Sequence, residues 1–161
     1  MHQVYLNNID ISKKRLPYII AEIGVNHEGS ISKAKHLIDL CASAGAHAAK
    51  FQTYKADTLA SIDSPAYWDI NQESSKNQHE LFKKYDCFNE EDYKSLFEYC
   101  NNKGIDFLST PFDLKSIDFL KSLKMKYFKI PSGEITNLPY LTKVAKLKKK
   151  VILSTGMANL L

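Results

Sequence analysis

Apolar runs and amphipathic segments alternate along most of the chain. Apolar residues recur at helical spacing over residues 30–46, 89–104, 113–123 and 137–147. Between these segments lie short, nearly continuous apolar runs, which are typical of parallel strands buried on both faces. These runs cover residues 15–24, 47–54, 105–110, 126–130 and 150–156. The pattern predicts an α/β fold in which strands and helices alternate strictly.

Two parts of the chain depart from this alternation. Residues 1–14 form a polar lead-in, and residues 55–88 are polar and irregular, with a helical pattern only at 79–85. An insertion of this length inside a compact domain is usually functional or mobile. We therefore expect the 55–88 segment to lie outside the main α/β fold and to be functional or mobile.

Two α/β architectures accommodate the alternation. A doubly wound nucleotide-binding sheet needs a glycine-rich phosphate turn after its first strand, and "EIGVNHEGS" contains Gly24 and Gly29 but no GxGxxG motif. A TIM (β/α) barrel needs eight units and about 250 residues. This chain supplies four βα units and a fifth strand in 161 residues. The sequence therefore predicts a partial barrel: residues 1–161 form its N-terminal portion, and the rest lies outside the chain.

Composition and charge exclude several classes of protein. Hydrophobic residues make up 44% of the chain and charged residues 25%, as in ordinary globular domains. The net charge of +4 is too small to predict nucleic-acid binding, and no arginine-rich or aromatic-interleaved basic stripe is present. No apolar run approaches transmembrane length, and the N-terminus lacks the apolar region of a signal peptide. We expect a cytoplasmic protein that binds neither nucleic acid nor membrane.

The three cysteines fit a reducing compartment. Cys41, Cys87 and Cys100 form neither a CxxC pair nor an even disulfide framework. Cys41 and Cys100 occupy apolar positions of helical patterns, which predicts buried, unpaired thiols.

Polar residues gather at the end of every predicted strand. Barrel enzymes build their active sites at the carboxyl ends of their strands. Recurrence at five strand ends favours one shared site over separate structural roles, such as capping of the next helix by a serine or threonine. The residues are Glu22; Lys50 and Gln52; Ser109 and Thr110; Lys129, Ser132 and Glu134; and Ser154 and Thr155.

Strand alternation predicts where the two strand lysines point. Lys50 shares one strand face with Ala48 and Gln52, and Lys129 lies opposite its neighbours Phe128 and Ile130. Both lysines can therefore point into the barrel together. Two lysines with several hydroxyls predict a site for a multiply charged anion, most naturally a phosphate with a carboxylate beside it.

The carboxylates and histidines allow further roles. Glu22 and Glu134 would orient sugar hydroxyls or move protons, although a simple Lys129–Glu134 ion pair is an alternative. His27, in the first strand–helix loop, is a candidate substrate contact. The other histidines show no metal-ligand spacing. The basic run "KLKKKV", residues 146–151, precedes a strand and so is predicted to be a solvated face at the opposite end.

Five stretches in the predicted order resemble one family, the nonulosonic (sialic) acid synthases. They are "AEIGVNHEGS", "KFQTY", "FLSTPFD", "FKIPSGEITNLPYL" and "ILSTGMANL", and the resemblance spans about residues 19–160. Synthases of this family are barrel enzymes that condense phosphoenolpyruvate with an N-acylated mannosamine-type sugar. "KFQTY" and "IPSGEITNLPYL" are most similar to the N,N′-diacetyllegionaminate synthases. The N-acetylneuraminate branch has a histidine where this chain has Phe51.

The resemblance implies roles for the same strand-end residues. It places the phosphoenolpyruvate contacts on Lys50, Gln52, Thr110, Lys129, Ser132 and Ser154. It implies that Glu22 and Glu134 hold the acceptor sugar and assist proton transfer, so that Glu22, Lys50, Lys129 and Glu134 are the catalytic set. C3 of phosphoenolpyruvate joins the open-chain sugar aldehyde, water enters at C2, and phosphate leaves by C–O cleavage.

The resemblance also implies parts that this chain lacks. A divalent metal, Mn²⁺ or Mg²⁺, polarises the aldehyde in the family, but its histidine ligands lie beyond Leu161, so none is expected here. The small C-terminal antifreeze-like domain, which completes the site of the partner subunit in a homodimer, also lies beyond Leu161. The chain departs at Leu161 from the usual "MANLGE" continuation, and we hypothesise a truncated or frameshifted product.

Two other functions remain open at this point. Lys129 could be the nucleophile of a Schiff-base aldolase. The chain could also be an inactive fragment that only pairs with complementary chains through the unpaired edges of its first and fifth strands.

Overall fold

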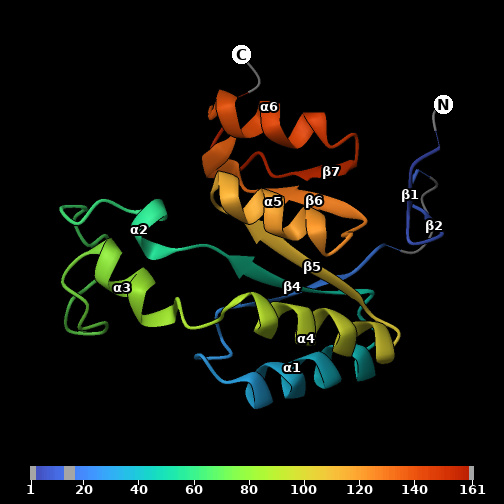
Figure 1. Ribbon diagram of the computed structural model, residues 1–161, viewed down its shortest axis with the longest axis horizontal. Helices are drawn as coiled ribbons and strands as arrows, with labels where there is room; N and C mark the ends of the chain where they lie inside the picture. Colours follow the sequence, from blue (N-terminus) through green and yellow to red (C-terminus); the bar gives the residue numbers. More distant parts are fainter. Residues whose placement is uncertain (1–2, 13–16, 160–161) are drawn as a thin grey trace.

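Strands and helices alternate from residue 20 onward in the computed structural model, which describes residues 3–12 and 17–159 (Figure 1). The alternation predicted from the apolar pattern is confirmed. Its members are β3 (Ile20–Gly24), α1 (Ile31–Ser43), β4 (Ala48–Thr53), α4 (Glu90–Asn102), β5 (Asp106–Pro111), α5 (Leu114–Ser122), β6 (Tyr127–Ile130), α6 (Leu138–Lys146) and β7 (Lys150–Leu153). The predicted first strand began at residue 15; residues 15 and 16 lie outside the described part, as do the last two residues of the chain.

All strands of this series run parallel. β3, β4 and β5 form one hydrogen-bonded sheet and β6 and β7 another, while β5 and β6 lie side by side (Figure 1). Lys50 is in register with Glu22 on one side and Leu108 on the other, and Lys129 is in register with Ile152. The carboxyl ends of the strands therefore come together at one end of the molecule.

Two apolar clusters cover the two sides of the strands. The larger cluster joins the helices to the strands and includes Ile38, Leu96, Leu120 and Val144 from the helices. The smaller cluster lies on the side away from the helices and is formed by Leu6, Ala48, Leu108 and Tyr127. Burial on both sides explains why the strand sequences are nearly continuous apolar runs.

Side-chain caps define the helix starts. Asn89 accepts hydrogen bonds from the backbone of Glu91 and Asp92, and Asp92 closes a capping box on the Asn89 backbone. Asp113 accepts from the backbone N–H of Ser116 at the start of α5. Asn89 and Asp113 are also the first residues of the helical segments that the sequence predicts.

The polar lead-in contains structure that the apolar pattern did not predict. β1 (Tyr5–Leu6) and β2 (Ile9–Asp10) form an antiparallel hairpin whose turn residues, Asn7 and Asn8, have φ of 42° and 66°. Paired asparagines suit this left-handed two-residue turn. Leu6 packs into the smaller cluster, so the hairpin belongs to the end where the strands begin.

The 55–88 segment forms a lobe beside the sheet (Figure 1). It contains the short α2 (Ala56–Leu59), which the pattern did not indicate, and α3 (Gln78–Tyr85), which it did. The Trp68 indole N–H donates to the carbonyls of Glu73 and Ser75 and closes the loop between the two helices.

The cysteines only partly match their predicted burial. Cys100 is buried, Cys41 is half-buried and Cys87 is exposed. Cys41 lies at the edge of the α1 face that meets the larger cluster, which leaves part of its side chain open to solvent.

Within residues 3–12 and 17–159, no helix combines the length and the apolar character needed to cross a membrane.

Candidate active site

Lys50 and Lys129 both lie on the side of the strands away from the helices. In β4, Ala49 and Phe51 pack in the helix-side cluster and Ala48 in the opposite one, which places Lys50 opposite the helices. In β6, Phe128 and Ile130 face the helices, so Lys129 points the other way. The alternation argument thus described correctly how both side chains are directed.

The Lys50 ammonium contacts partners from two neighbouring strands. It forms an ion pair with the Glu22 carboxylate and lies 3.4 Å from the Thr110 hydroxyl oxygen, to which it donates. The Lys50 side chain is 12% exposed, whereas Glu22 is 49% exposed. A mostly buried cation is thus paired with a carboxylate that water still reaches, so an incoming anion could replace part of that pairing.

The Lys129 ammonium has a weaker set of hydrogen-bond and ion-pair partners than the Lys50 ammonium. Its ammonium donates to the carbonyl of Ile130 at 3.2 Å. Burial lowers the pKa of Lys129, the positive charge of Lys50 lowers it further, and Glu22 opposes the shift. The two lysines are therefore close enough to repel each other, and the site gains from a bound anion.

The turn after β6 separates Lys129 from Glu134. Residues Ser132–Glu134 form a 3₁₀ turn, and the Glu134 carboxylate accepts a 2.6 Å hydrogen bond from the Asn137 side chain. No ion pair joins Lys129 to Glu134 among the residues that the structure describes. The ion-pair alternative, in which Lys129 and Glu134 simply neutralise each other, is thus not observed among these residues.

The ends of β6 and β7 bring Ser132 and Ser154 close together. The Ser154 backbone N–H donates to the Ile130 carbonyl at 3.1 Å. A β-carbon on Gly156 would lie 3.9 Å from the Ser132 hydroxyl oxygen, so the loop after β7 passes next to the turn after β6. These two serines and Lys129 come from adjacent strand ends.

Gln52 lies near Glu22 at the ends of β3 and β4. A β-carbon on Gly24 would meet the Glu22 carboxylate at 3.4 Å and the Gln52 side-chain amide at 3.6 Å. Gly24 has φ of +57°, a conformation that favours glycine. The structure therefore places Glu22, Gln52, Lys50 and Thr110 in one group beside the Lys129 group.

Two strand-end hydroxyls do not join this group as the sequence suggested. Ser109 is fully buried, and its hydroxyl pairs with the Thr53 hydroxyl at 2.6 Å. Adjacent residues alternate along β5, so Ser109 and Thr110 point to opposite sides. Thr155 is exposed beyond the end of β7. The strand-end pattern counted both residues because it ignored which side they face.

His27 is placed away from the lysines. It is 2% exposed and stacks on Phe88, with ring centroids 4.1 Å apart, and its Nδ1 accepts from the backbone N–H of Gly29. Burial, helped by the charge of Lys33, lowers its pKa to about 4, so the ring is neutral near pH 7. This packing gives His27 a structural role, and the substrate contact stays a prediction.

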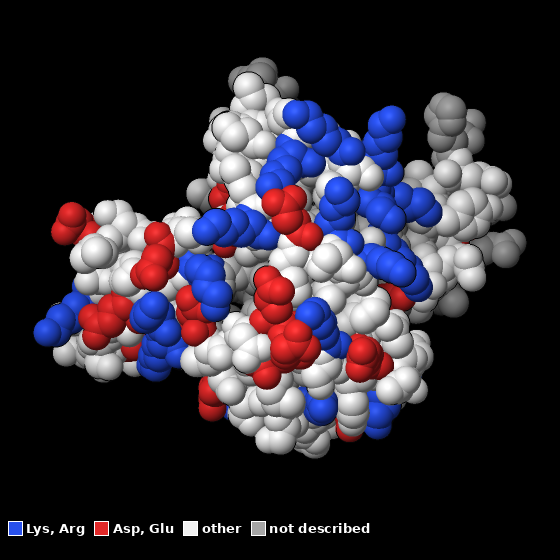
Figure 2. All heavy atoms as spheres, in the orientation of Figure 1, with Lys and Arg blue, Asp and Glu red and all other residues white. Residues whose placement is uncertain are grey.

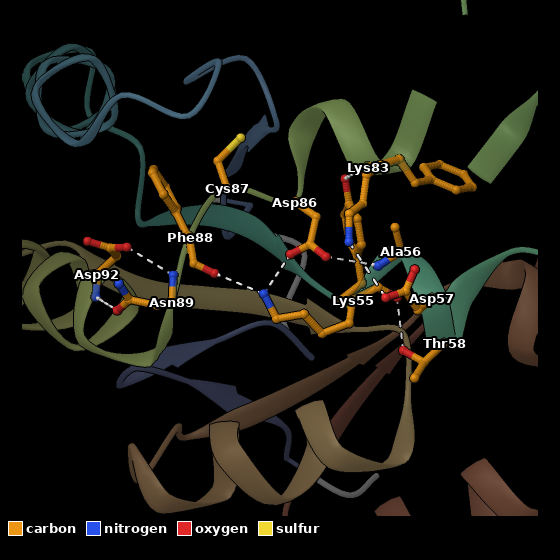
Figure 3. Close-up of polar contacts among 12 residues, drawn as sticks. Lys55, Ala56, Asp57, Thr58, Lys83, Asp86, Cys87, Phe88, Asn89 and Asp92 are labelled. Carbon is orange, nitrogen blue, oxygen red and sulfur yellow. Dashed lines mark hydrogen bonds and ion pairs between the residues drawn. The ribbon is translucent and has the colours of Figure 1, made fainter. Parts of the chain in front are cut away.

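A polar clamp that the sequence did not reveal closes the neck of the 55–88 lobe (Figure 3). The Asp86 carboxylate accepts from the Lys55 ammonium at 2.6 Å and from the Ala56 backbone N–H at 3.0 Å, and Lys55 also donates to the Phe88 carbonyl. The clamp borders a cavity of about 600 Å³ on the helix side, floored by Tyr54, Phe88, Tyr93 and Phe119. The sequence pattern did not predict a role for Asp86, because its partners Lys55 and Ala56 lie about 30 residues earlier in the chain.

The described residues do not supply a metal centre. In residues 3–12 and 17–159, no group of three histidine, cysteine, aspartate or glutamate side chains could hold a metal ion. These described residues do not fit the divalent metal that the resemblance implies, and no chemical step is assigned to a metal.

The geometry defines a class of protein: an α/β domain with an anion-attracting group of side chains at the carboxyl ends of parallel strands. The NeuB family model matches residues 37–161, and the chain belongs to the NeuB family. The chain is 49% identical over 145 residues to the N,N′-diacetyllegionaminic acid synthase of Legionella pneumophila, covering 89% of this chain and 40% of that protein. It is also 49% identical over 144 residues to the synthase of the same name from Campylobacter jejuni, covering 88% of this chain and 43% of that protein.

A solved structure shares the fold. The N-acetylneuraminic acid synthetase of Leptospira borgpetersenii superposes with a TM-score of 0.80 at 31% identity, covering 99% of this chain and 51% of that one. The chain therefore has the α/β fold of sialic acid synthase structures, and it spans about two fifths of the length of the two curated relatives. These relatives are named as synthases that make sugar acids.

Proposed function

We propose that residues 1–161 are the N-terminal portion of a synthase TIM (β/α) barrel and supply its phosphoenolpyruvate half-site. The observation that carries this proposal is the placement of Lys50 and Lys129 on the same side of the strands, away from the helices. Ser132, Ser154 and Thr110 lie at adjoining strand ends and would add hydroxyl donors, and Gln52 an amide. The rest of the barrel, the antifreeze-like domain and the homodimer belong to the complete cytoplasmic enzyme in this proposal.

The proposed chemistry uses charge and position. Phosphoenolpyruvate carries a carboxylate and a phosphate, so two ammonium groups can hold both ends and orient C3 toward the acceptor. When C3 attacks the sugar aldehyde, the aldehyde oxygen takes up a proton and C2 becomes electron-poor. Water adds at C2 and loses a proton, which leaves a C2 hydroxyl beside the phosphate oxygen. This hydroxyl then loses its proton and becomes the ketone carbonyl as the bond from C2 to the phosphate oxygen breaks and phosphate leaves. Glu22 and Glu134 are the carboxylates that would exchange these protons and hold sugar hydroxyls.

The acceptor we propose is a 2,4-diacetamido-trideoxy mannose-type sugar rather than N-acetylmannosamine. The support is the 49% identity to two N,N′-diacetyllegionaminic acid synthases. A version extended to the length of these relatives should release phosphate from phosphoenolpyruvate with the first sugar at least about tenfold faster than with the second. Faster turnover of N-acetylmannosamine would contradict the choice of acceptor. Absence of turnover with both sugars, in a folded and Mn²⁺-loaded protein, would contradict the synthase.

The 161-residue chain by itself should bind phosphoenolpyruvate but turn over little or none of it, because more than half of a relative's length is missing from it. Calorimetry with phosphoenolpyruvate and a phosphate-release assay with either sugar test the two statements separately. Sugar-dependent phosphate release by the chain alone would overturn the second.

One observation favours a second function, a Schiff-base aldolase. The lowered pKa of Lys129 is a property that nucleophilic lysines share. Borohydride reduction in the presence of pyruvate would then add a pyruvyl group to Lys129, detectable by mass spectrometry of its peptide. An unmodified Lys129 would exclude this function.

A further inference from the structure

A second basic site lies at the opposite end of the strands from Lys50 and Lys129. A cavity of about 600 Å³ opens where the β1–β2 hairpin meets the start of β6 and the turn between α6 and β7. Its lining residues are Tyr5, Asn7, Asn8, Lys126, Tyr127, Lys148, Lys149 and Lys150. Four of these residues are lysines, and no carboxylate is among them.

Two of the four lysines already have partners. Lys126 donates to the Asp106 carboxylate at 2.8 Å and to the Asn7 side-chain oxygen at 3.1 Å. Lys150 donates to the Tyr5 carbonyl at 2.5 Å, which positions the ammonium but leaves its charge uncompensated. Lys148 and Lys149 form no ion pair or side-chain hydrogen bond with any residue in the described ranges. Three cations at the cavity, Lys148, Lys149 and Lys150, are therefore not paired with a carboxylate within residues 3–12 and 17–159.

Asp106 cannot supply the missing negative charge. It is 7% exposed and accepts hydrogen bonds from Tyr18, Tyr127 and Lys126. Burial alone would raise its pKa, but the three donors reverse the effect and lower it. Asp106 is thus an ionised carboxylate whose oxygens already accept from Tyr18 and from the cavity residues Lys126 and Tyr127.

The turn between α6 and β7 brings several lysines of like charge together. Lys148 has φ of 51°, a left-handed conformation at the end of α6 that glycine adopts more easily. Residues 146–150 contain four lysines and no acid, and lysines gather over α5, α6 and β7 (Figure 2). The chain as a whole has a net charge of only +4, so positive charge is concentrated on this side. An anion in the cavity would offset the repulsion.

We propose that this cavity is a binding site for a small phosphate-type anion, held by Lys148, Lys149 and Lys150 with the Asn7 and Asn8 amides beside them. The ammonium groups act as point charges on phosphate oxygens and the amides add directed donors. The cavity's volume suits a diphosphate as well as a single phosphate. The proposal revises the prediction that residues 146–151 are merely a solvated face, and it is independent of the proposed synthase activity.

Nuclear magnetic resonance titration of the 161-residue chain with inorganic phosphate and with pyrophosphate tests the site. Saturable shifts are expected for the amides of Asn7, Asn8 and residues 148–150, at chloride concentrations adjusted to constant ionic strength. Pyrophosphate should bind more tightly because it carries more charge. The shifts should persist in Lys129→Met, which removes phosphate binding at the strand-end lysines and so separates this proposal from the proposed function.

The variant Lys148→Gln with Lys149→Gln should raise the pyrophosphate dissociation constant by about tenfold or more, since each lost bond to a charged group weakens binding several-fold or more. Lys35→Gln with Lys76→Gln removes the same charge elsewhere and should change the constant less than about twofold. Unshifted amides at the cavity in the parent chain would overturn the proposal. Equal weakening in both double variants would also overturn it, because the effect would then be one of net charge. The charge reversal Lys149→Glu, read on the same amides, checks the result if the first variant unfolds.

Discussion

The two ends of the strands hold their buried charges in opposite ways. At the starting end, Asp106 is surrounded by three donors, two of them tyrosine hydroxyls that also contact each other. At the carboxyl end, the half-buried Lys129 has, among the described residues, a backbone carbonyl as its one hydrogen-bond acceptor, and Lys50 pairs with an exposed carboxylate. A satisfied buried network stabilises a fold, whereas an under-compensated group of like charges is typical of a binding site. The comparison separates the stabilising Asp106 network from the binding group of Lys50 and Lys129, and mutations can test that separation.

Asp106→Ala should have the largest effect on stability. Removing the carboxylate leaves the Tyr18 and Tyr127 hydroxyls without their acceptor and Lys126 without its counter-charge. We expect the free energy of unfolding to fall by about 3–5 kcal/mol, measured by urea denaturation. The control Asp118→Asn removes an exposed partner of Lys143 and should cost less than about 1 kcal/mol. A loss as small as that of the control would mean that the Asp106 network does not stabilise the fold.

Acidification should reveal His27 as a structural residue. Its folded pKa of about 4 lies below the ordinary 6.5, so the unfolded chain binds the proton more readily. Stability is therefore intact above about pH 6.5 and is lost as the pH falls toward 4, by up to about 3 kcal/mol at about 1.4 kcal/mol per pH unit. His27→Phe should reduce this pH dependence in urea denaturation series, and the exposed His36→Phe should not. Equal slopes in all three proteins would contradict the assignment.

Lys129→Met should weaken binding at the carboxyl end without unfolding the chain. We expect phosphoenolpyruvate to bind about tenfold to a hundredfold more weakly, because a hydrogen bond to a charged group is worth about 1.5–3 kcal/mol. Glu134→Gln should leave the affinity within about twofold, since its carboxylate pairs with Asn137 rather than with a lysine. Calorimetry measures both affinities. If both variants were destabilised equally and bound equally well, the strand-end group would be structural, and the contrast between the two ends would fail.

The smallest effect concerns proton uptake. The pKa of free Lys129 lies below 10.5, chiefly through burial, and a bound anion raises it again. Phosphoenolpyruvate binding should therefore take up protons between this lowered pKa and about pH 10.5, and the affinity should fall as the pH rises through that window. Calorimetry at pH 9–10 in two buffers of different ionisation enthalpy detects the uptake. Lys129→Met should show none; the same uptake in this variant would assign the proton to another group.

Local patterns accounted for most of the fold and for part of the site. Helix starts at Asn89 and Asp113 follow from cap chemistry, and the directions of Lys50 and Lys129 follow from strand alternation. Alternation also separates Thr110 from Ser109, although the strand-end pattern had grouped them. Local patterns could not show how deeply a side chain is buried. The sequence pattern places His27 in a loop, yet Phe88, about 60 residues later, stacks on its ring and covers it.

The sequence by itself determined the order of strands and helices, where most of them begin and end, and which side of each strand a residue faces. Periodicity and capping act over a few residues, so they can be read directly from the chain. Only the tertiary structure decided that Glu22 meets Lys50, that Asp86 closes the neck of the lobe, and that the hairpin joins Lys126 and Lys150 around a basic cavity. These contacts link residues about 30 to 145 positions apart. They depend on which strands become neighbours and how they pack, which no local spacing encodes.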